Sequence, residues 1–234
     1  MRKEKIEELK AYFEELKTIK AIKQDVEAKF LKTEVYDCYL NNGEVIRREK
    51  QIKGNNTGSA AVVLPVTKDN NVILTVEPRV FTKRTVGLGI PAGYIEPGEK
   101  GIDAARRELL EETGYVSENI YPLGGFYQDM GVSSAYNELF LATGCKKLYD
   151  QNLDESEFIK YFSCTYDEAL ELIDLGYIDS AAHSSIPSST FSAVMGRWRT
   201  RTPLALYTAS AIAGQGVLIT HSPIDFAPNG PVGS

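Results

Sequence analysis

Histidine is missing from the first 182 of the 234 residues, and the chain's two histidines are His183 and His221. Without histidine, this part of the chain can form neither a Ser-His-Asp triad nor a zinc site with histidine ligands. Its polar chemistry must therefore use carboxylates. The whole chain has 32 Asp and Glu residues that could supply them. Carboxylate oxygens suit a hard cation such as Mg²⁺.

Cysteine is scarce, and long apolar runs are absent. The three cysteines are Cys38, Cys145 and Cys164, and no two of them have the C-x-x-C spacing of a zinc or redox site. We therefore expect free thiols in a reducing cytoplasm. No apolar run is long enough to span a bilayer, and the first 16 residues are too charged for a signal peptide. The sequence thus predicts a cytoplasmic protein without a membrane partner.

The overall charge argues against nucleic acid as a partner. Formal net charge is −6, whereas nucleic-acid-binding domains are usually basic. The hydrophobic share of 43% and the charged share of 25% are ordinary for a soluble globular protein with a sizeable core.

The most informative stretch runs from Gly93 to Tyr115 and reads as a tight loop followed by a short helix. Glu108, Glu111 and Glu112 have the spacing i, i+3, i+4, which places three carboxylates on one side of a helix. Three acids in one turn repel each other, so they are consistent with a bound Mg²⁺ between them. From these residues alone, a solvated acidic helix face remains the alternative.

The same stretch fits the pattern G-x5-E-x7-R-E-U-x-E-E-x-G-U, where U is an apolar residue. The matching residues are Gly93, Glu99, Arg107, Glu108, Leu109, Glu111, Glu112, Gly114 and, at a position more often aliphatic, Tyr115. This pattern is the signature of the Nudix hydrolases, and the sequence resembles that family. The resemblance implies the Nudix fold, an α/β (α+β) architecture in which a mixed β-sheet lies between helices.

The resemblance also implies a metal site. It makes Glu108 and Glu112 direct ligands of Mg²⁺, with Mn²⁺ as a substitute, and Glu111 a third ligand, directly or through water. The backbone carbonyl of Ala92 is expected as a further ligand. Arg107 is counted with the catalytic residues because the family uses this arginine to orient the glutamates.

Two further positions complete the predicted site. Residues 150–157 form an acidic loop, and similar enzymes donate their catalytic base from such a loop. Glu155 and Glu157 are the matching positions, with Glu157 favoured, and a solvated loop is the alternative. Arg79 lies where the ADP-ribose pyrophosphatase branch places an arginine near the substrate phosphates.

Alternating polar and apolar residues, turn residues and capping residues predict the other elements. We expect helices over residues 2–28 and 166–175, the second with a capping box between Thr165 and Glu168. The first helix could pack on its own chain or on a partner chain, and we expect the former. Strands are expected over residues 30–39, 44–52, 59–67, 71–76, 86–90, 121–128, 135–142 and 158–162. Turn residues at 41–43 and at 69–70 predict that the first two strands form one hairpin and the next two strands form another.

Three domains are predicted. Residues 1–57 form an N-terminal helix and hairpin, which in the similar branch helps to build a homodimer and its substrate pocket. Residues 58–181 form the Nudix domain. Residues 182–234 lack Lys and Glu and are rich in Ser, Ala, Thr, Pro and Gly. This tail is interpreted either as foreign to the fold, through a frameshift or fusion, or as a disordered or small extra element.

The predicted function is Mg²⁺-dependent hydrolysis of the pyrophosphate bond in a nucleotide sugar, ADP-ribose first. ADP-ribose enzymes of this family often carry a proline after the motif, but no proline occurs between Pro122 and Pro187. Other nucleoside diphosphate sugars therefore stay open. The alternatives are a non-catalytic nucleotide sensor and a hydrolase of nucleoside triphosphates or coenzyme A.

Overall fold

A computed structural model describes residues 3–54 and 57–178. The predicted tail 182–234 lies outside the described residues. The elements are, in chain order, α1 (Lys3–Leu16), β1 (Leu31–Tyr39), β2 (Val45–Lys53), β3 (Ala60–Thr67), β4 (Asn71–Pro78), β5 (Val86–Gly89), β6 (Ala92–Tyr94), α2 (Gly101–Thr113), β7 (Tyr115–Val116), β8 (Asn119–Tyr127), β9 (Tyr136–Lys147), β10 (Lys160–Thr165) and α3 (Tyr166–Asp174).

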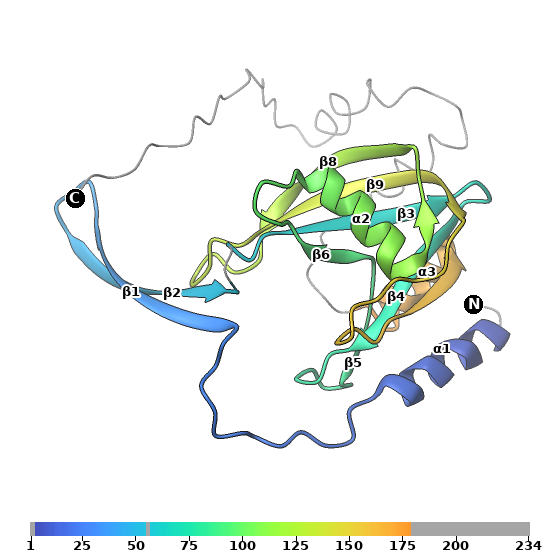
Figure 1. Ribbon diagram of the computed structural model, residues 1–234, viewed down its shortest axis with the longest axis horizontal. Coiled ribbons are helices and arrows are strands. Elements are labelled where there is room, and N and C mark those ends of the chain that lie inside the picture. Colours follow the sequence, from blue (N-terminus) through green and yellow to red (C-terminus); the bar gives the residue numbers. More distant parts are fainter. Residues whose placement is uncertain (1–2, 55–56, 179–234) are drawn as a thin grey trace. The chain divides into compact units, whose positions relative to one another are not determined.

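The larger sheet has the strand order β10-β4-β3-β9-β7, and β5, β6 and β8 pair with β4, β3 and β9 (Figure 1). Strands β3 and β9 run parallel, with Val63 opposite Phe140, whereas the other paired strands run antiparallel. The predicted mixed sheet of an α+β fold is thus confirmed. β3 is buried along nearly its whole length, as expected for a central strand.

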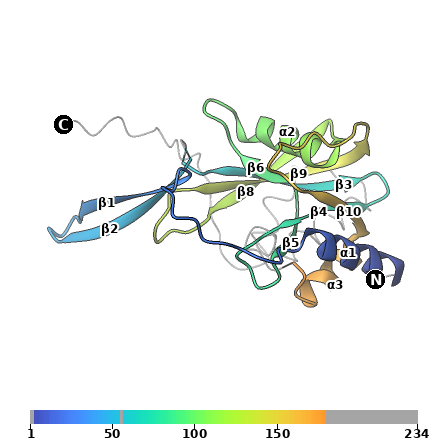
Figure 2. The same cartoon turned by 60° about the horizontal axis from the view of Figure 1, so that its bottom comes forward.

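Helices cover both faces of this sheet. Figure 2 shows α2 on one side and α1 and α3 on the other, next to β4 and β10. Ala104, Ala105 and Leu109 of α2 are fully buried against residues of β3, β8 and β9. Burying a side chain such as Leu109 contributes about 2 kcal/mol. This packing holds the acid-bearing helix firmly on the sheet.

The N-terminal helix is shorter than predicted. The prediction of a helix to residue 28 is wrong, because α1 ends at Leu16. The apolar stripe that packs α1 also ends there, and Ile19, Ile22 and Val26 further along are exposed. Without a buried face, the β-branched residues after Leu16 do not sustain a helix.

α1 packs on its own chain, as expected. Its Leu9 is buried, Lys5 Nζ lies 2.9 Å from Glu168 Oε2, and the rings of Phe13 and Tyr177 meet edge to face at 5.8 Å. Glu168 also completes the predicted capping box at Thr165. A short stripe of apolar residues is therefore enough to attach this helix to α3 and its surroundings.

Both predicted N-terminal hairpins are present. β1 and β2 form a separate two-stranded sheet that turns at Gly43, whose φ is 89°. β3 and β4 turn at Asn70, whose φ of 60° suits asparagine. The turn residues marked both hairpins correctly because each supplies the positive φ that the turn requires.

Strands later in the chain differ from the prediction at their ends. β9 continues to Lys147 rather than ending at residue 142, since Gly144 at φ 66° and an irregular register beside Thr67 let the pairing go on. β10 begins at Lys160, not at residue 158, because a turn joins Glu157 N to Asp154 O at 2.9 Å. The short strands β6 and β7 were not predicted.

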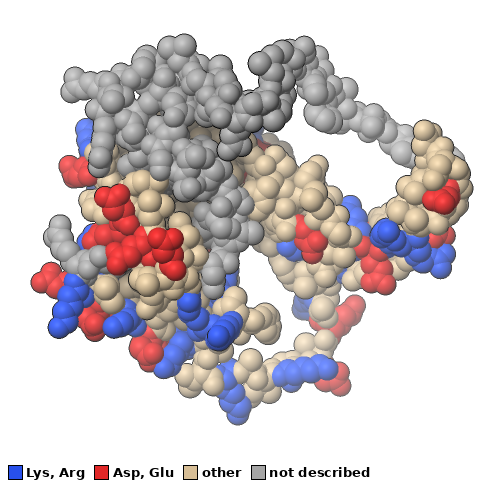
Figure 3. All heavy atoms as spheres, turned by 180° about the vertical axis from the view of Figure 1, so that it is seen from behind, with Lys and Arg blue, Asp and Glu red and all other residues tan. Residues whose placement is uncertain are grey.

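No helix within the described residues has both the length and the apolar character needed to cross a membrane. On the face drawn in Figure 3, the described residues present both acidic and basic side chains, and several acidic side chains lie together at the left.

Candidate active site

The loop before α2 is held by backbone and carboxylate hydrogen bonds. Pro91 O accepts from Val63 N at 2.9 Å, which ties the loop to β3. Glu99 N donates to Glu96 O, and Glu96 N donates back to the Glu99 carboxylate, both at 2.9 Å. Glu99 therefore shapes the turn that brings Ala92 and Gly93 beside the helix.

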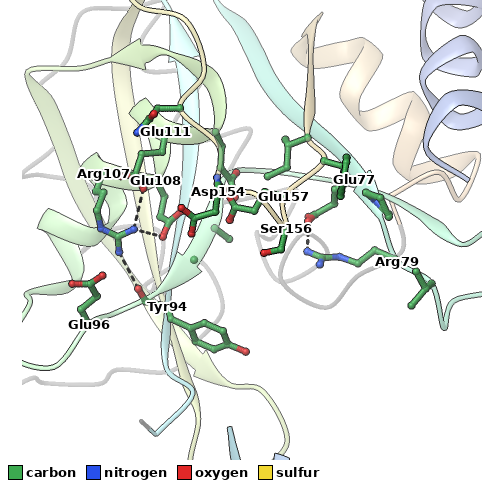
Figure 4. A pocket seen from close by; sticks show the side chains of 18 residues that line it. Glu77, Arg79, Tyr94, Glu96, Arg107, Glu108, Glu111, Asp154, Ser156 and Glu157 are labelled. Atoms are coloured by element: carbon green, nitrogen blue, oxygen red, sulfur yellow. Dashed lines mark hydrogen bonds and ion pairs between the residues drawn. The ribbon is translucent and has the colours of Figure 1, made fainter. Parts of the chain in front are cut away.

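The glutamates of α2 face one cavity of about 630 Å³. Glu108 and Glu112 are 6% and 5% exposed, and Glu111 is more accessible. The other carboxylates that line the cavity come from distant parts of the chain and are Glu77, Glu96, Asp154 and Glu157. In Figure 4, Asp154 and Glu157 lie between the α2 glutamates and Glu77. The fold thus gathers acids from β4, α2 and the loop before β10.

Gly93 leaves the space that the Glu108 carboxylate occupies. A Cβ at residue 93 would lie 1.9 Å from Glu108 Oε1 and 2.2 Å from its Cδ, so a side chain there would push the Glu108 carboxylate out of this position. The Glu108 carboxylate consequently lies directly against the backbone of β6. This contact explains why the motif needs glycine at that position.

Arg107 connects the glutamates to the loop. Its Nη1 lies 2.6 Å from Glu108 Oε1 and 3.2 Å from Glu111 Oε2. Its Nε and Nη2 donate to the Glu99 carboxylate, both at 3.1 Å. Nη2 also donates to Tyr94 O at 3.0 Å (Figure 4). The hydrogen bonds that Arg107 donates to Glu99 raise its pKa most, and those to Glu108 and Glu111 raise it further, whereas burial opposes the shift. Arg107 therefore stays charged and fixes the direction of both glutamates.

The pKa values of the two buried glutamates of α2, Glu108 and Glu112, are raised. Burial raises the pKa of Glu112 well above its ordinary value, and the nearby charges of Glu77, Glu108 and Glu157 raise it further. Burial likewise raises the pKa of Glu108, against the opposing effect of Arg107. Like charges in a desolvated site favour protons or a cation. The cavity is therefore built to receive positive charge.

The donor set fits a divalent cation. In residues 3–54 and 57–178, Glu112 Oε2 is a buried oxygen that makes no hydrogen bond. A buried acceptor without a partner is costly, and a metal ion would satisfy it. The described side chains form no group of three or more that is already close enough to hold a metal. Metal binding would therefore require these carboxylates to move closer together.

The acidic loop is anchored to the end of α2. Asn152 N donates to Glu111 O at 2.9 Å, and Gln151 Nε2 donates to Glu112 O at 2.5 Å. Of the two predicted bases, Glu157 lines the cavity. Glu155 is exposed and is not among the lining residues. The anchoring keeps Glu157 opposite the helix that carries the other acids.

Arg79 lines the cavity, and its guanidinium is paired with Glu77. The sequence interpretation missed Glu77, as well as Asp154 and Ser156. Burial raises the pKa of Glu77, and Arg79 opposes this effect. An acid at the end of the apolar run VILTVE was a usable signal, because a charged residue there must find a partner or a ligand.

A family model described as the NUDIX domain matches residues 56–182. The chain is 35% identical to the ADP-ribose pyrophosphatase of Bacillus subtilis (strain 168) over 161 residues, which cover 68% of this chain and 84% of that protein. It is 36% identical to the methanol dehydrogenase activator of Bacillus methanolicus over 162 residues, 69% of this chain and 84% of that protein.

A crystal structure of an ADP compounds hydrolase shares the fold. Its TM-score is 0.58 at 21% identity, over 86% of this chain and 96% of that chain. The motif of α2, the mixed sheet and the family match agree with one another. The chain therefore belongs to the Nudix family and is a Nudix hydrolase.

Proposed function

We propose that the chain hydrolyses the pyrophosphate bond of a nucleoside diphosphate sugar, with ADP-ribose as the first candidate, and releases a nucleoside monophosphate and a sugar phosphate. The observation that carries this proposal is the ring of carboxylates around one cavity, with the unpartnered oxygen of Glu112 among them. Two relatives of nearly equal identity carry different names, so similarity alone does not choose the substrate.

Glu108, Glu111, Glu112 and the carbonyl of Ala92 would hold Mg²⁺, or Mn²⁺ in its place. When bound, the ion neutralises phosphate charge and lowers the pKa of a bound water. Arg107 acts as a positioning residue, because it contacts Glu108 and Glu111 directly.

Glu157 is the proposed general base. It accepts a proton from the attacking water as the water oxygen bonds to phosphorus and the bond to the bridging oxygen breaks. Its place on the cavity wall supports this role, whereas the exposed Glu155 is the weaker candidate. A base needs to reach its proton by hydrogen bonding, directly or through one water.

Arg79 is the proposed contact to the substrate phosphates. Its side chain is 55% exposed at the cavity, and it is paired with Glu77. A guanidinium matches phosphate oxygens well, so substrate would compete with Glu77 for it.

Residues 1–57 are the proposed dimerisation segment, and residues 58–181 the catalytic domain. The hairpin exposes apolar side chains that a second chain could cover: Leu31, Val35, Tyr36, Tyr39 and Val45. Clustered exposed apolar residues are typical of interaction sites. A cytoplasmic homodimer without nucleic-acid or membrane partners remains a prediction.

The test is a substrate panel. The protein is incubated with Mg²⁺ and, separately, ADP-ribose, ADP-glucose, GDP-mannose, UDP-glucose, ATP and coenzyme A, and nucleotide products are measured. We expect a monophosphate from at least one nucleotide sugar. Hydrolysis of ATP or coenzyme A alone would replace the proposed substrate class, and binding without any hydrolysis would indicate a sensor.

A further inference from the structure

A second cavity, of about 390 Å³, adjoins the acidic one. The two share five lining residues, Glu77, Arg79, Ala92, Gly93 and Tyr94. Much of the second cavity's wall is apolar and comes from β3 and from residues 87–90 in and after β5. A small cavity with an apolar wall and a few polar groups is typical of a ligand subsite.

Arg79 lies where the two cavities meet. A Cβ at Gly87 would lie 2.7 Å from Arg79 Cγ, so the glycine leaves room for the arginine stem on β5. A diphosphate bound at Arg79 would therefore have its reacting phosphorus toward the acids and its other substituent toward the second cavity.

A chain of hydrogen bonds fixes the orientation of two side-chain amides, Gln128 and Asn137, that line the second cavity. Lys53 Nζ donates to Gln128 Oε1 at 2.6 Å. Gln128 Nε2 donates to Asn137 Oδ1 at 2.7 Å and to Gly58 O at 2.9 Å. Because an ammonium group can only donate, it fixes the orientation of the Gln128 amide, and Gln128 in turn fixes that of Asn137.

Asn137 is left with its donor unused. The residue is 8% exposed and lines the second cavity, as does Gln128. Its Oδ1 is committed to Gln128, and Nδ2 makes no hydrogen bond to any residue in 3–54 or 57–178. An amide donor that opens onto a cavity selects its ligand, because a ligand without an acceptor would cut this donor off from water and leave it unsatisfied.

We propose that the second cavity receives the part of the substrate attached to the diphosphate, and that Asn137 Nδ2 donates a hydrogen bond to an acceptor on it. The acceptor is a sugar oxygen or a ring nitrogen or carbonyl of the base. This inference rests on the proposed function, and it assigns Asn137 as a residue that determines specificity, held in place by Gln128 and Lys53.

The experiment compares the wild type with Asn137→Asp and Asn137→Leu. Both variants lose the donor, but only Asn137→Asp adds charge, and its oxygen can still accept from Gln128. Asn119→Asp, at an exposed position on β8, controls for charge. Steady-state kinetics with Mg²⁺ use ADP-ribose, ADP-glucose and UDP-glucose, and calorimetry in EDTA measures binding of the same three compounds.

We expect both Asn137 variants to raise KM about tenfold and to weaken binding similarly, with kcat changed less than about threefold. If the acceptor is on the sugar, the Asn137 variants should change the enzyme's preference between ADP-ribose and ADP-glucose. If the acceptor is on the base, they should change its preference between ADP-glucose and UDP-glucose. An Asn137→Leu variant that behaves as the wild type overturns the inference, because the effect of Asn137→Asp would then be charge alone.

The two proposals fail separately. If the wild type hydrolyses a nucleotide sugar and neither Asn137 variant alters KM or binding, the subsite is wrong and the proposed function stands. If the wild type hydrolyses no nucleotide sugar of the full substrate panel but binds one of the three, and both Asn137 variants weaken that binding, the subsite stands and the proposed function fails.

Discussion

Glu112 is buried near the charges of Glu77, Glu108 and Glu157. We expect its carboxylate, which serves as a metal ligand in the proposed function, to destabilise the metal-free protein. We predict that Glu112→Gln lowers kcat roughly 100-fold or more, because an uncharged amide is a far weaker metal ligand than a carboxylate. Steady-state kinetics with Mg²⁺ measure this. Glu118→Gln, at an exposed turn before β8, is the matched control and should keep full activity. A Glu112→Gln enzyme at wild-type rate would exclude Glu112 as a ligand.

The same substitution should stabilise the metal-free protein in a pH-dependent way. The pKa of Glu112 is raised above its ordinary 4.5, so the folded chain binds the proton more tightly than the unfolded chain. The stability gained from this proton is complete below the unfolded pKa and is lost as pH rises through the folded pKa.

Thermal unfolding in EDTA tests this prediction. The Tm of Glu112→Gln should exceed that of the wild type, and the difference should grow as pH rises from 4.5. At its largest, the difference in the free energy of unfolding should be roughly 1 kcal/mol. A margin that shrinks with rising pH would show that the Glu112 carboxylate is stabilised by its surroundings.

At the residue scale, the sequence predicted the carboxylates of α2 but not all of the acids that line the cavity with them. Spacing alone placed Glu108, Glu111 and Glu112 on one side of a helix. Glu77 and Asp154 were missed, because their closeness depends on how β4 and the loop before β10 meet α2. The family resemblance pointed to both Glu155 and Glu157, whereas the structure distinguishes them by exposure.

The element that organises the site is α2, and its end is tightly specified. Gly114 closes the helix at φ 69°, and Leu148 N and Tyr149 N donate to its carbonyl at 3.1 and 3.2 Å. A Cβ there would lie 2.0 Å from Tyr149 O. Both conformation and space therefore demand glycine.

We predict that Gly114→Ala destabilises the fold by about 3 kcal/mol, from left-handed backbone strain and overlap with Tyr149. Gly144→Ala is the matched control, since Gly144 has φ 66° but nothing within 4 Å of its added Cβ. It should cost only about 1 kcal/mol. Urea unfolding measures both, and equal losses would mean that packing at Gly114 contributes nothing.

Element boundaries were predictable where a residue forces them. Gly43, Asn70, Gly114 and the Thr165 cap each marked a turn or helix end that the structure contains. The end of α1 was not predictable from residues 17–28, whose charges and apolar residues still resemble a helix. That helix ends because nothing buries its next turn, and burial is a tertiary property.

On the scale of the whole molecule, the hairpin of β1 and β2 predicts self-association. Val35, Tyr39 and Val45 are at least half exposed, and Tyr39 pairs with Val45 across the strands. We expect the wild type to sediment at about twice the chain's 25.9 kDa. Val35→Glu should shift it to the monomer, because a charge in an apolar interface is costly.

Sedimentation velocity at micromolar protein checks this prediction, with Asn119→Glu as a control that adds the same charge on β8, away from the hairpin. The control should remain dimeric. A monomeric wild type, or a dimer that Val35→Glu leaves intact, would contradict the assigned surface.

The most direct test of the carboxylate cluster is metal binding itself. Mn²⁺ titration, followed by electron paramagnetic resonance, compares the wild type, Glu112→Gln and Glu118→Gln. The account predicts that the wild type and Glu118→Gln bind Mn²⁺ alike, that Mg²⁺ competes, and that Glu112→Gln binds at least about tenfold more weakly. Equal Mn²⁺ affinity in all three proteins would contradict it.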